Sequence, residues 1–261
     1  MRWYCDFTVR DANKLLFGLI LFELCLVLIF AADTLLGSPS WIIKELIDLD
    51  EEHNIPAWFS SVQLFLIALV FLLKSCQLYP DHSPLRSFFL MVSTGFIFLS
   101  ADEVASIHEK ITWVFKHVEF MPRFKGDHGI WIFVYALIGL ILFLAAFRTL
   151  AAMWKRYRQA TLIMAIGMGM ALIGGVVMEV ISYQFLRSGS TPLLYKAEVA
   201  IEEFLEMSGV SVTLYGAILL LLYEELKGGG RGSNYMPNNT MNADRIKPVI
   251  ANVILKEDKE Y

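Results

Sequence analysis

The chain has 261 residues, of which 56% are hydrophobic and 18% are charged, and its mean hydropathy is +0.55. A soluble domain of this size is far less apolar, so the composition excludes a cytosolic enzyme and indicates a multi-pass membrane protein whose first partner is the lipid bilayer. The formal net charge of −4 offers no basic surface to nucleic acid, so nucleic-acid binding is excluded as well.

Six stretches are long and apolar enough to cross about 30 Å of hydrocarbon, which takes roughly 20 helical residues. Lipid provides no hydrogen-bond partners for the backbone, and the sequence lacks the alternation that is typical of outer-membrane strands. The predicted fold is therefore an all-α, polytopic membrane helical bundle. In chain order the predicted spans are residues 15–36, 57–78, 87–107, 129–151, 160–185 and 199–223, within a transmembrane domain of residues 1–226.

The segments around the spans carry signals of their own. The first span follows a basic segment, as the core of a signal peptide would, but its length predicts an uncleaved anchor. Residues 41–49 place their apolar side chains largely on one side of a helix, which predicts a segment lying in the membrane interface. The glycine-rich start of residues 227–261 predicts a flexible tail. Close helix contacts are predicted at four glycines of the fifth span: Gly167, Gly169, Gly174 and Gly175.

Lysine and arginine in short loops predict which side of the membrane each loop faces. The densest cluster lies between the fourth and fifth spans and consists of Arg148, Lys155, Arg156 and Arg158. This loop is predicted to be cytoplasmic. Alternation then places both termini in the cytoplasm, together with the loop assigned Lys74 and Arg86, and the remaining loops outside.

Acidic groups gather at one depth near the predicted outer face. A charged side chain at the centre of a membrane-spanning helix costs at least about 2.5–3.5 kcal/mol, so its position marks a cavity, a partner or a function. Glu179 lies about 9 Å below the outer end of the fifth span. The other members of this predicted site flank the outer ends of the third and sixth spans: Asp102, Glu103, His108, Glu109, Glu202 and Glu206. Glu198 is expected to be solvated at the interface, and Glu23 to be a neutral carboxyl hydrogen-bonded to a neighbouring helix.

Helix geometry limits how these side chains can meet. At about 100° per residue, Asp102 and Glu109 share one face of a helix, whereas Glu103 and His108 flank that face on opposite sides. One straight helix therefore cannot aim all four side chains at a single point. On the sixth span the glutamates form a stripe that must face inward, because lipid would not tolerate it.

An oxygen-rich cluster with one imidazole suits Mn, Fe, Ca or Mg better than Zn. We therefore predict a divalent metal ion bound by Asp102, Glu103, His108, Glu109, Glu179, Glu202 and Glu206, with His108 as ligand or catalytic base. Three functions fit such a site: a metal-dependent hydrolase or transferase acting on a membrane or outer-face substrate, a cation or proton-coupled transporter, and a non-catalytic assembly or sensor protein. Polar residues continuing inward below the site would favour transport, and Glu23 is the main candidate in the sequence.

Three motifs occur in order along the chain: LDxExxxPxWFSS at residues 49–61, DExxxxHE at residues 102–109 and EExxEMxG at residues 202–209. Together they resemble a group of uncharacterised bacterial multi-span membrane proteins. The resemblance covers roughly residues 15–225. It implies a location in the inner (plasma) membrane and implies no particular reaction.

Overall fold

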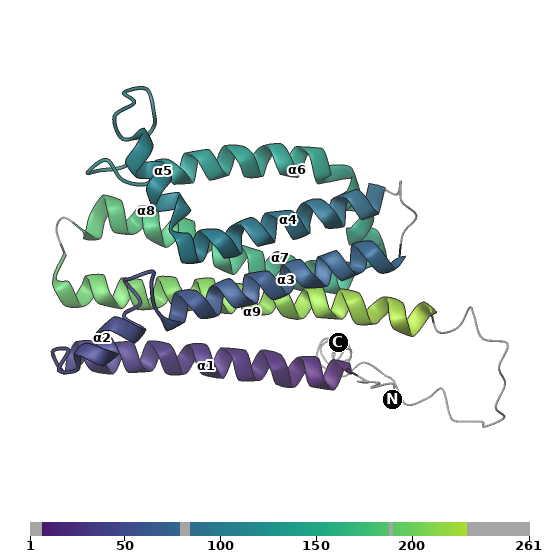
Figure 1. Cartoon of the computed structure of the whole chain (residues 1–261), viewed down its shortest axis with the longest axis horizontal. Helices are drawn as coiled ribbons and strands as arrows, with labels where there is room; N and C mark the ends of the chain where they lie inside the picture. The colour runs from purple at the N-terminus through teal and green to yellow at the C-terminus, as the bar shows by residue number, and fades with distance from the viewer. Residues whose placement is uncertain (1–6, 79–83, 188–189, 229–261) are drawn as a thin grey trace, which may run out of the picture. The chain divides into compact units, whose positions relative to one another are not determined.

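The computed structural model describes residues 7–78, 84–187 and 190–228 (Figure 1). Residues Met1–Glu225 form one compact unit, and Leu226–Tyr261 are a separate one. Most of the tail predicted to be flexible, residues 229–261, therefore lies outside the described residues. Within the described residues the regular structure is entirely helical, which confirms the predicted all-α class.

Six helical segments of the described residues are long and apolar enough to cross a membrane, and each falls on one predicted span. Four of them are α1 (Val9–Leu35), α3 (Ile55–Leu78), α4 (Pro84–Ala105) and α6 (Ile130–Arg156). The fifth runs through α7 (Arg158–Leu172), η1 (Ile173–Met178), α8 (Glu179–Ile181) and η2 (Ser182–Leu186), and the sixth is α9 (Pro192–Gly228). Two short helices, α2 (Trp41–Ile47) and α5 (Ile107–Phe115), lie in the loops.

The long helices run side by side, with α1 along one edge and α6 along the other (Figure 1). Helix α9 is the most enclosed of the long helices. In its most apolar stretch of 18 residues 61% are buried, compared with 17% in the corresponding stretches of α1 and α6. Stacked rings of Phe71 in α3 and of Phe89 and Phe96 in α4 fill part of the core. The apolar outer faces of α1 and α6 suit helices that face lipid.

Glycines let α7 and η1 approach α9 at backbone distance. A Cβ on Gly167 would lie 2.6 Å from the carbonyl oxygen of Gly209, and one on Gly174 would lie 2.8 Å from that of Glu202. Such distances leave no room for a side chain, so the predicted contacts are confirmed at these two glycines. The prediction is wrong for Gly169, which has nothing within 4 Å of a Cβ position.

Lys74 does not lie in a loop, although the predicted orientation counted it as a loop residue. Its side chain is fully buried in α3, and its ammonium group donates a hydrogen bond of 3.1 Å to the carbonyl oxygen of Leu220. A buried, hydrogen-bonded ammonium group is part of the bundle rather than a loop charge. The predicted orientation therefore rests mainly on the cluster at residues 148–158.

Candidate functional site

A cavity of about 900 Å³ lies at the end of the bundle where α3, α6 and α9 begin and α4 ends. We call this end the acidic end. The apolar side chains that line the cavity include Phe96, Leu99, Phe143, Met168 and Leu172. Its acidic lining comprises Asp50, Glu51, Glu52, Asp102, Glu103, Glu109, Glu179, Glu202, Glu203 and Glu206, and its basic lining is His108 and Arg187. The cavity is therefore strongly acidic in one part and apolar in another.

A break in the chain direction aims the third span's polar groups into this cavity. Helix α4 ends at Ala105 and α5 begins at Ile107, and Ser106 between them is left-handed with a φ of 48°. The backbone N–H of His108 donates a hydrogen bond of 2.8 Å to Asp102 Oδ1 and so closes the turn. Because the helix is broken, Asp102, Glu103 and His108 all reach one cavity, which a straight helix would not allow.

His108 is held between two carboxylates. Its Nδ1 lies 3.2 Å from Asp102 Oδ1 and its Nε2 lies 2.9 Å from Glu52 Oε1, while Trp131 packs edge-on at 5.1 Å between ring centroids. Burial works to lower the pKa of His108, but the hydrogen bonds and charges of the two carboxylates outweigh it and raise the pKa to about 10. The imidazole is therefore protonated at neutral pH, and each ring N–H donates to a carboxylate.

The pKa values of two carboxyl groups near His108 shift in opposite directions. Burial works to raise the pKa of Glu52, but the contact with His108 lowers it below its ordinary value. Burial and then the charge of Glu52 raise the pKa of Glu109, which has no such contact with the imidazole. Glu52 is thus an ionised partner of His108, while Glu109 binds its proton more tightly than a free carboxyl.

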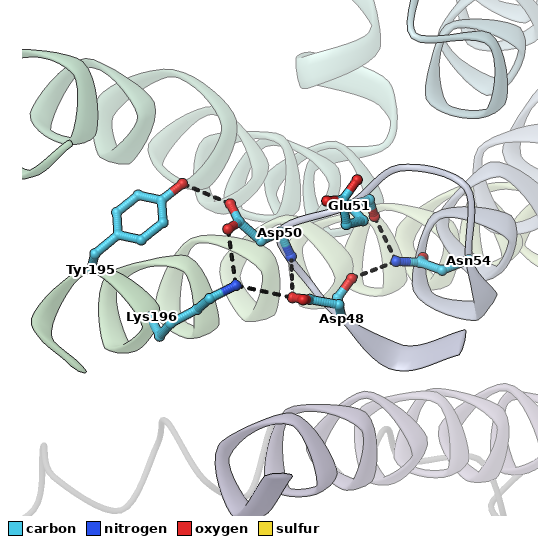
Figure 2. A network of polar contacts seen from close by, with 6 residues as sticks. All are labelled: Asp48, Asp50, Glu51, Asn54, Tyr195 and Lys196. Carbon is cyan, nitrogen blue, oxygen red and sulfur yellow. Dashed lines mark hydrogen bonds and ion pairs between the residues drawn. The ribbon is translucent and has the colours of Figure 1, made fainter. Parts of the chain in front are cut away.

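The loop that presents Glu52 is fastened to the start of α9 (Figure 2). Lys196 donates to Asp48 Oδ1 at 3.2 Å and to Asp50 Oδ2 at 2.9 Å, and the Tyr195 hydroxyl donates to Asp50 Oδ1 at 2.7 Å. The side-chain amide of Asn54 donates to the carbonyl oxygens of Asp48 and Glu51 and closes the loop from the other side. These contacts fix the path of the backbone through Glu52.

Irregular helix turns shape the part of the cavity wall that the fifth span forms. Glu179 lies between two π-helical segments, η1 and η2, which interrupt the fifth span. Segments of this kind are rare and frequent at functional sites. The Glu206 carboxyl of α9 lies over η1, because a Cβ built on Gly175 would be 2.9 Å from Glu206 Oε1. The two glycines at residues 174 and 175 thus make room for this carboxyl.

All seven residues predicted as metal ligands line this one cavity: Asp102, Glu103, His108, Glu109, Glu179, Glu202 and Glu206. They do not form a ready-made metal site, since no three His, Cys, Asp or Glu side chains of the described residues are placed to hold an ion together. Both ring nitrogens of His108 are also engaged by carboxylates. A metal ion would therefore need side chains to turn, and on His108 it would have to replace one carboxylate contact.

One expectation about this region is wrong, and five charged residues of the cavity lining were not among the predicted ligands. Glu198 is 5% exposed, and neither of its carboxylate oxygens has a hydrogen-bond partner in the described part of the chain, so it is not solvated. The cavity is also lined by charged residues outside the predicted ligand set, namely Asp50, Glu51, Glu52, Glu203 and Arg187. Glu52 lies in the first of the three motifs, and that motif is the sequence signal that could have found it.

The fold and this cavity define a polytopic helical membrane protein with a buried acidic site at one end of the bundle. The chain belongs to the family described as a domain of unknown function (DUF8692), whose family model matches residues 18–221. The match covers nearly all of the six-span unit. No curated protein and no solved structure matches the chain.

Proposed function

We propose that the protein binds an amphipathic molecule from the membrane. Its positively charged head would lie among the acidic side chains of the cavity, and its apolar tail would lie along the apolar lining. The observation that carries this proposal is the cavity of about 900 Å³ itself, in which acidic and apolar linings are combined. Ligand pockets commonly combine a large apolar wall with a few polar groups that orient the ligand.

The charge of the lining favours a cationic head. Ten acidic side chains line the cavity, whereas its basic side chains are one arginine and one histidine. Desolvated carboxylates that lie close together repel one another, so some must be protonated or neutralised by a bound cation. A cationic head would relieve this repulsion, and an anionic head would add to it.

The depth of the cavity favours a tail. Gly139 and Phe143 line it, 9 and 13 residues after the start of α6 at Ile130, which corresponds to about 14 and 20 Å along the helix. A head group alone would leave this part empty. Side chains of both α4 and α6 line the apolar part, and α6 forms one edge of the bundle (Figure 1). The exposed apolar side chains of α6 suit contact with lipid. We propose entry from the bilayer along this edge.

The experiment uses a set of probes with one dodecyl chain and different heads. Purified protein in nanodiscs is melted with dodecyltrimethylammonium, dodecyl maltoside or dodecyl sulfate below their micellar concentrations. Only the cationic probe should raise the melting temperature, by mass action. Tetramethylammonium, which lacks the tail, should have little effect. Equal shifts for all heads would overturn the proposal.

Matched variants connect this binding to the cavity. Glu202→Gln and Glu206→Gln should each weaken the response to dodecyltrimethylammonium, because each removes a carboxylate that lines the cavity. Glu45→Gln makes the same change at an exposed position of α2 and should leave the response unchanged. If Glu206→Gln binds the probe as the wild type does, the acidic end is not the head site.

A second candidate is the divalent metal-dependent hydrolase or transferase predicted above. The shared cavity of the seven predicted ligands favours it, and Mn, Fe, Ca or Mg would suit them better than Zn. Elemental analysis and melting curves with each metal at several pH values provide the test. Binding should release protons and weaken as pH falls. If no metal copurifies and none shifts the melting temperature, the metal candidate fails.

A cation or proton-coupled transporter is favoured by polar groups beyond the acidic end. Gln63 and Ser211 are fully buried with Glu23 among α1, α3 and α9, which is more inward polarity than the sequence suggested. Uptake of the cationic probe into protein-containing liposomes, driven by an imposed pH gradient, would support transport. Saturable binding without uptake would support an enzyme, a sensor or an assembly protein.

For orientation, we propose a bacterial inner-membrane location with both termini cytoplasmic and the acidic end outside, from the basic cluster at residues 148–158. Reporter fusions at residues 50, 120 and 190 should then score outside. Fusions at residues 82, 155 and 235 should score inside. The reverse pattern would place the acidic end in the cytoplasm.

A further inference from the structure

We propose that Glu23, Gln63 and Ser211 form a proton-binding site inside the membrane, with the proton held on the Glu23 carboxyl. We call this group of three residues the Glu23 site. None of its members lines the cavity, and the proposal does not depend on the function proposed above. It rests on contacts among three helices that are distant in sequence.

The Glu23 site is sealed and lies near the middle of α1. Glu23 and Ser211 are 0% exposed and Gln63 is 1% exposed. Glu23 is 14 residues from the start of α1 at Val9 and 12 from its end at Leu35, or about 20 Å from either end. A charge here would be buried near the middle of a membrane-spanning helix, away from both of its ends.

The hydrogen bonds leave one oxygen of the carboxyl without a partner. Glu23 Oε1 accepts from the Gln63 amide at 3.1 Å and from the Ser211 hydroxyl at 2.5 Å. The same amide donates to the Ser211 oxygen at 2.6 Å. Glu23 Oε2 and Gln63 Oε1 are both buried with no hydrogen-bond partner among the described residues. A proton on Oε2 supplies the donor that the group lacks.

No cationic partner accompanies this carboxyl. Among the described residues its polar contacts are the amide and the hydroxyl, which are both neutral. The nearest titratable groups along the three helices are Cys25 on α1, Lys74 on α3, and Glu206 and Tyr215 on α9. Lys74 lies 11 residues beyond Gln63, or about 16 Å along α3, and donates to Leu220 instead. An unpaired buried carboxylate is strongly disfavoured, and a proton removes that penalty.

The proton would also secure α1. This helix is attached through few buried side chains, namely Ala12, Glu23, Leu26 and Phe30. Glu23 is the polar member of that set, so its charge state acts directly on the contact of α1 with α3 and α9. Loss of the proton should weaken this contact.

Infrared spectroscopy tests the site directly, because a protonated carboxyl has a C=O stretch that an ionised one lacks. The difference spectrum between wild type and Glu23→Gln in nanodiscs at neutral pH should show loss of one protonated-carboxyl band. Loss of a carboxylate band instead would overturn the proposal. Glu45→Gln, at an exposed position, should remove a carboxylate band. Ser211→Ala keeps the carboxyl and should shift the same band, so the test stands even if Glu23→Gln fails to fold.

Melting across pH distinguishes a proton from a metal cation. If unfolding releases the Glu23 proton, the unfolding equilibrium constant of the wild type rises with pH by up to about tenfold more per pH unit than that of Glu23→Gln. This extra slope should be the same in sodium, potassium and choline buffers. Stabilisation at high pH by sodium or potassium alone would overturn the proton assignment in favour of a monovalent metal ion.

Discussion

Replacing Glu52 with glutamine should lower the pKa of His108. The substitution removes a carboxylate whose oxygen lies 2.9 Å from His108 Nε2, and leaves the contact with Asp102 at 3.2 Å in place. An opposite charge at this distance typically moves a pKa by about 1–3. The pKa of His108, about 10 in the wild type, should fall by that amount, which corresponds to roughly 1.4–4 kcal/mol of lost stabilisation of the imidazolium.

The sign of the pH dependence follows from the raised pKa. A histidine whose folded pKa lies above its unfolded value of about 6.5 stabilises the protein fully below that value. The contribution is lost as pH rises through about 10. Wild-type stability should therefore decline between these two pH values, and Glu52→Gln should complete its decline at a lower pH.

Nitrogen-15 NMR of selectively labelled histidine provides the assay. The chain has 5 histidines, and His108→Gln identifies the signal of interest. Glu51→Gln is the matched control, because the exposed Glu51 side chain makes no ion pair with His108 among the described contacts. Titration of wild-type His108 near its ordinary pKa would refute the reasoning, as would equal effects of the two substitutions.

Two further predictions test how the bundle and the loop are held. Gly209→Ala should destabilise the protein by about 1–3 kcal/mol in reversible denaturation, because the new Cβ would collide with the backbone nitrogen of Ala171 in α7. Gly169→Ala places its Cβ in open space and should be neutral or stabilising by up to about 1 kcal/mol. Lys196→Met removes both ion pairs that fasten the loop to α9, so the loop should hold Glu52 less firmly against His108. The pKa of His108 should therefore fall, but by less than in Glu52→Gln. Lys44→Met, at an exposed position, should leave that pKa unchanged.

The six spans were predictable because membrane crossing depends on length and apolar composition, which are local properties. The boundaries were less so. Helix α9 begins at Pro192, seven residues before the predicted start at residue 199. The extra turns contain Tyr195, Lys196 and Glu198, which a hydropathy pattern assigns to a loop. In the structure the first two make tertiary contacts with Asp48 and Asp50, which a hydropathy pattern does not encode.

Part of the cavity lining was predictable from the sequence, but the geometry of the candidate site was not. Depth along each helix placed the seven predicted side chains at one level, and the structure places them in one cavity. The pairing of Glu52 with His108 depends on a loop path that no helical periodicity encodes. The left-handed Ser106 and the two π-helical segments have no sequence signal comparable to a glycine in a turn. These irregular turns are also the features that direct the acidic groups inward.

Access to water distinguishes the two groups of buried acids. At the acidic end, His108 compensates Asp102 and Glu52, and the remaining carboxylates line a cavity large enough to admit a cation or a charged head group. The Glu23 site has the same need for positive charge, but its members are sealed among three helices. We propose that a proton meets that need, because a proton on the carboxyl does not require the bundle to open. A single physical rule, that a desolvated carboxylate requires a positive partner, therefore leads to an exchangeable ligand in the cavity and to a retained proton at Glu23.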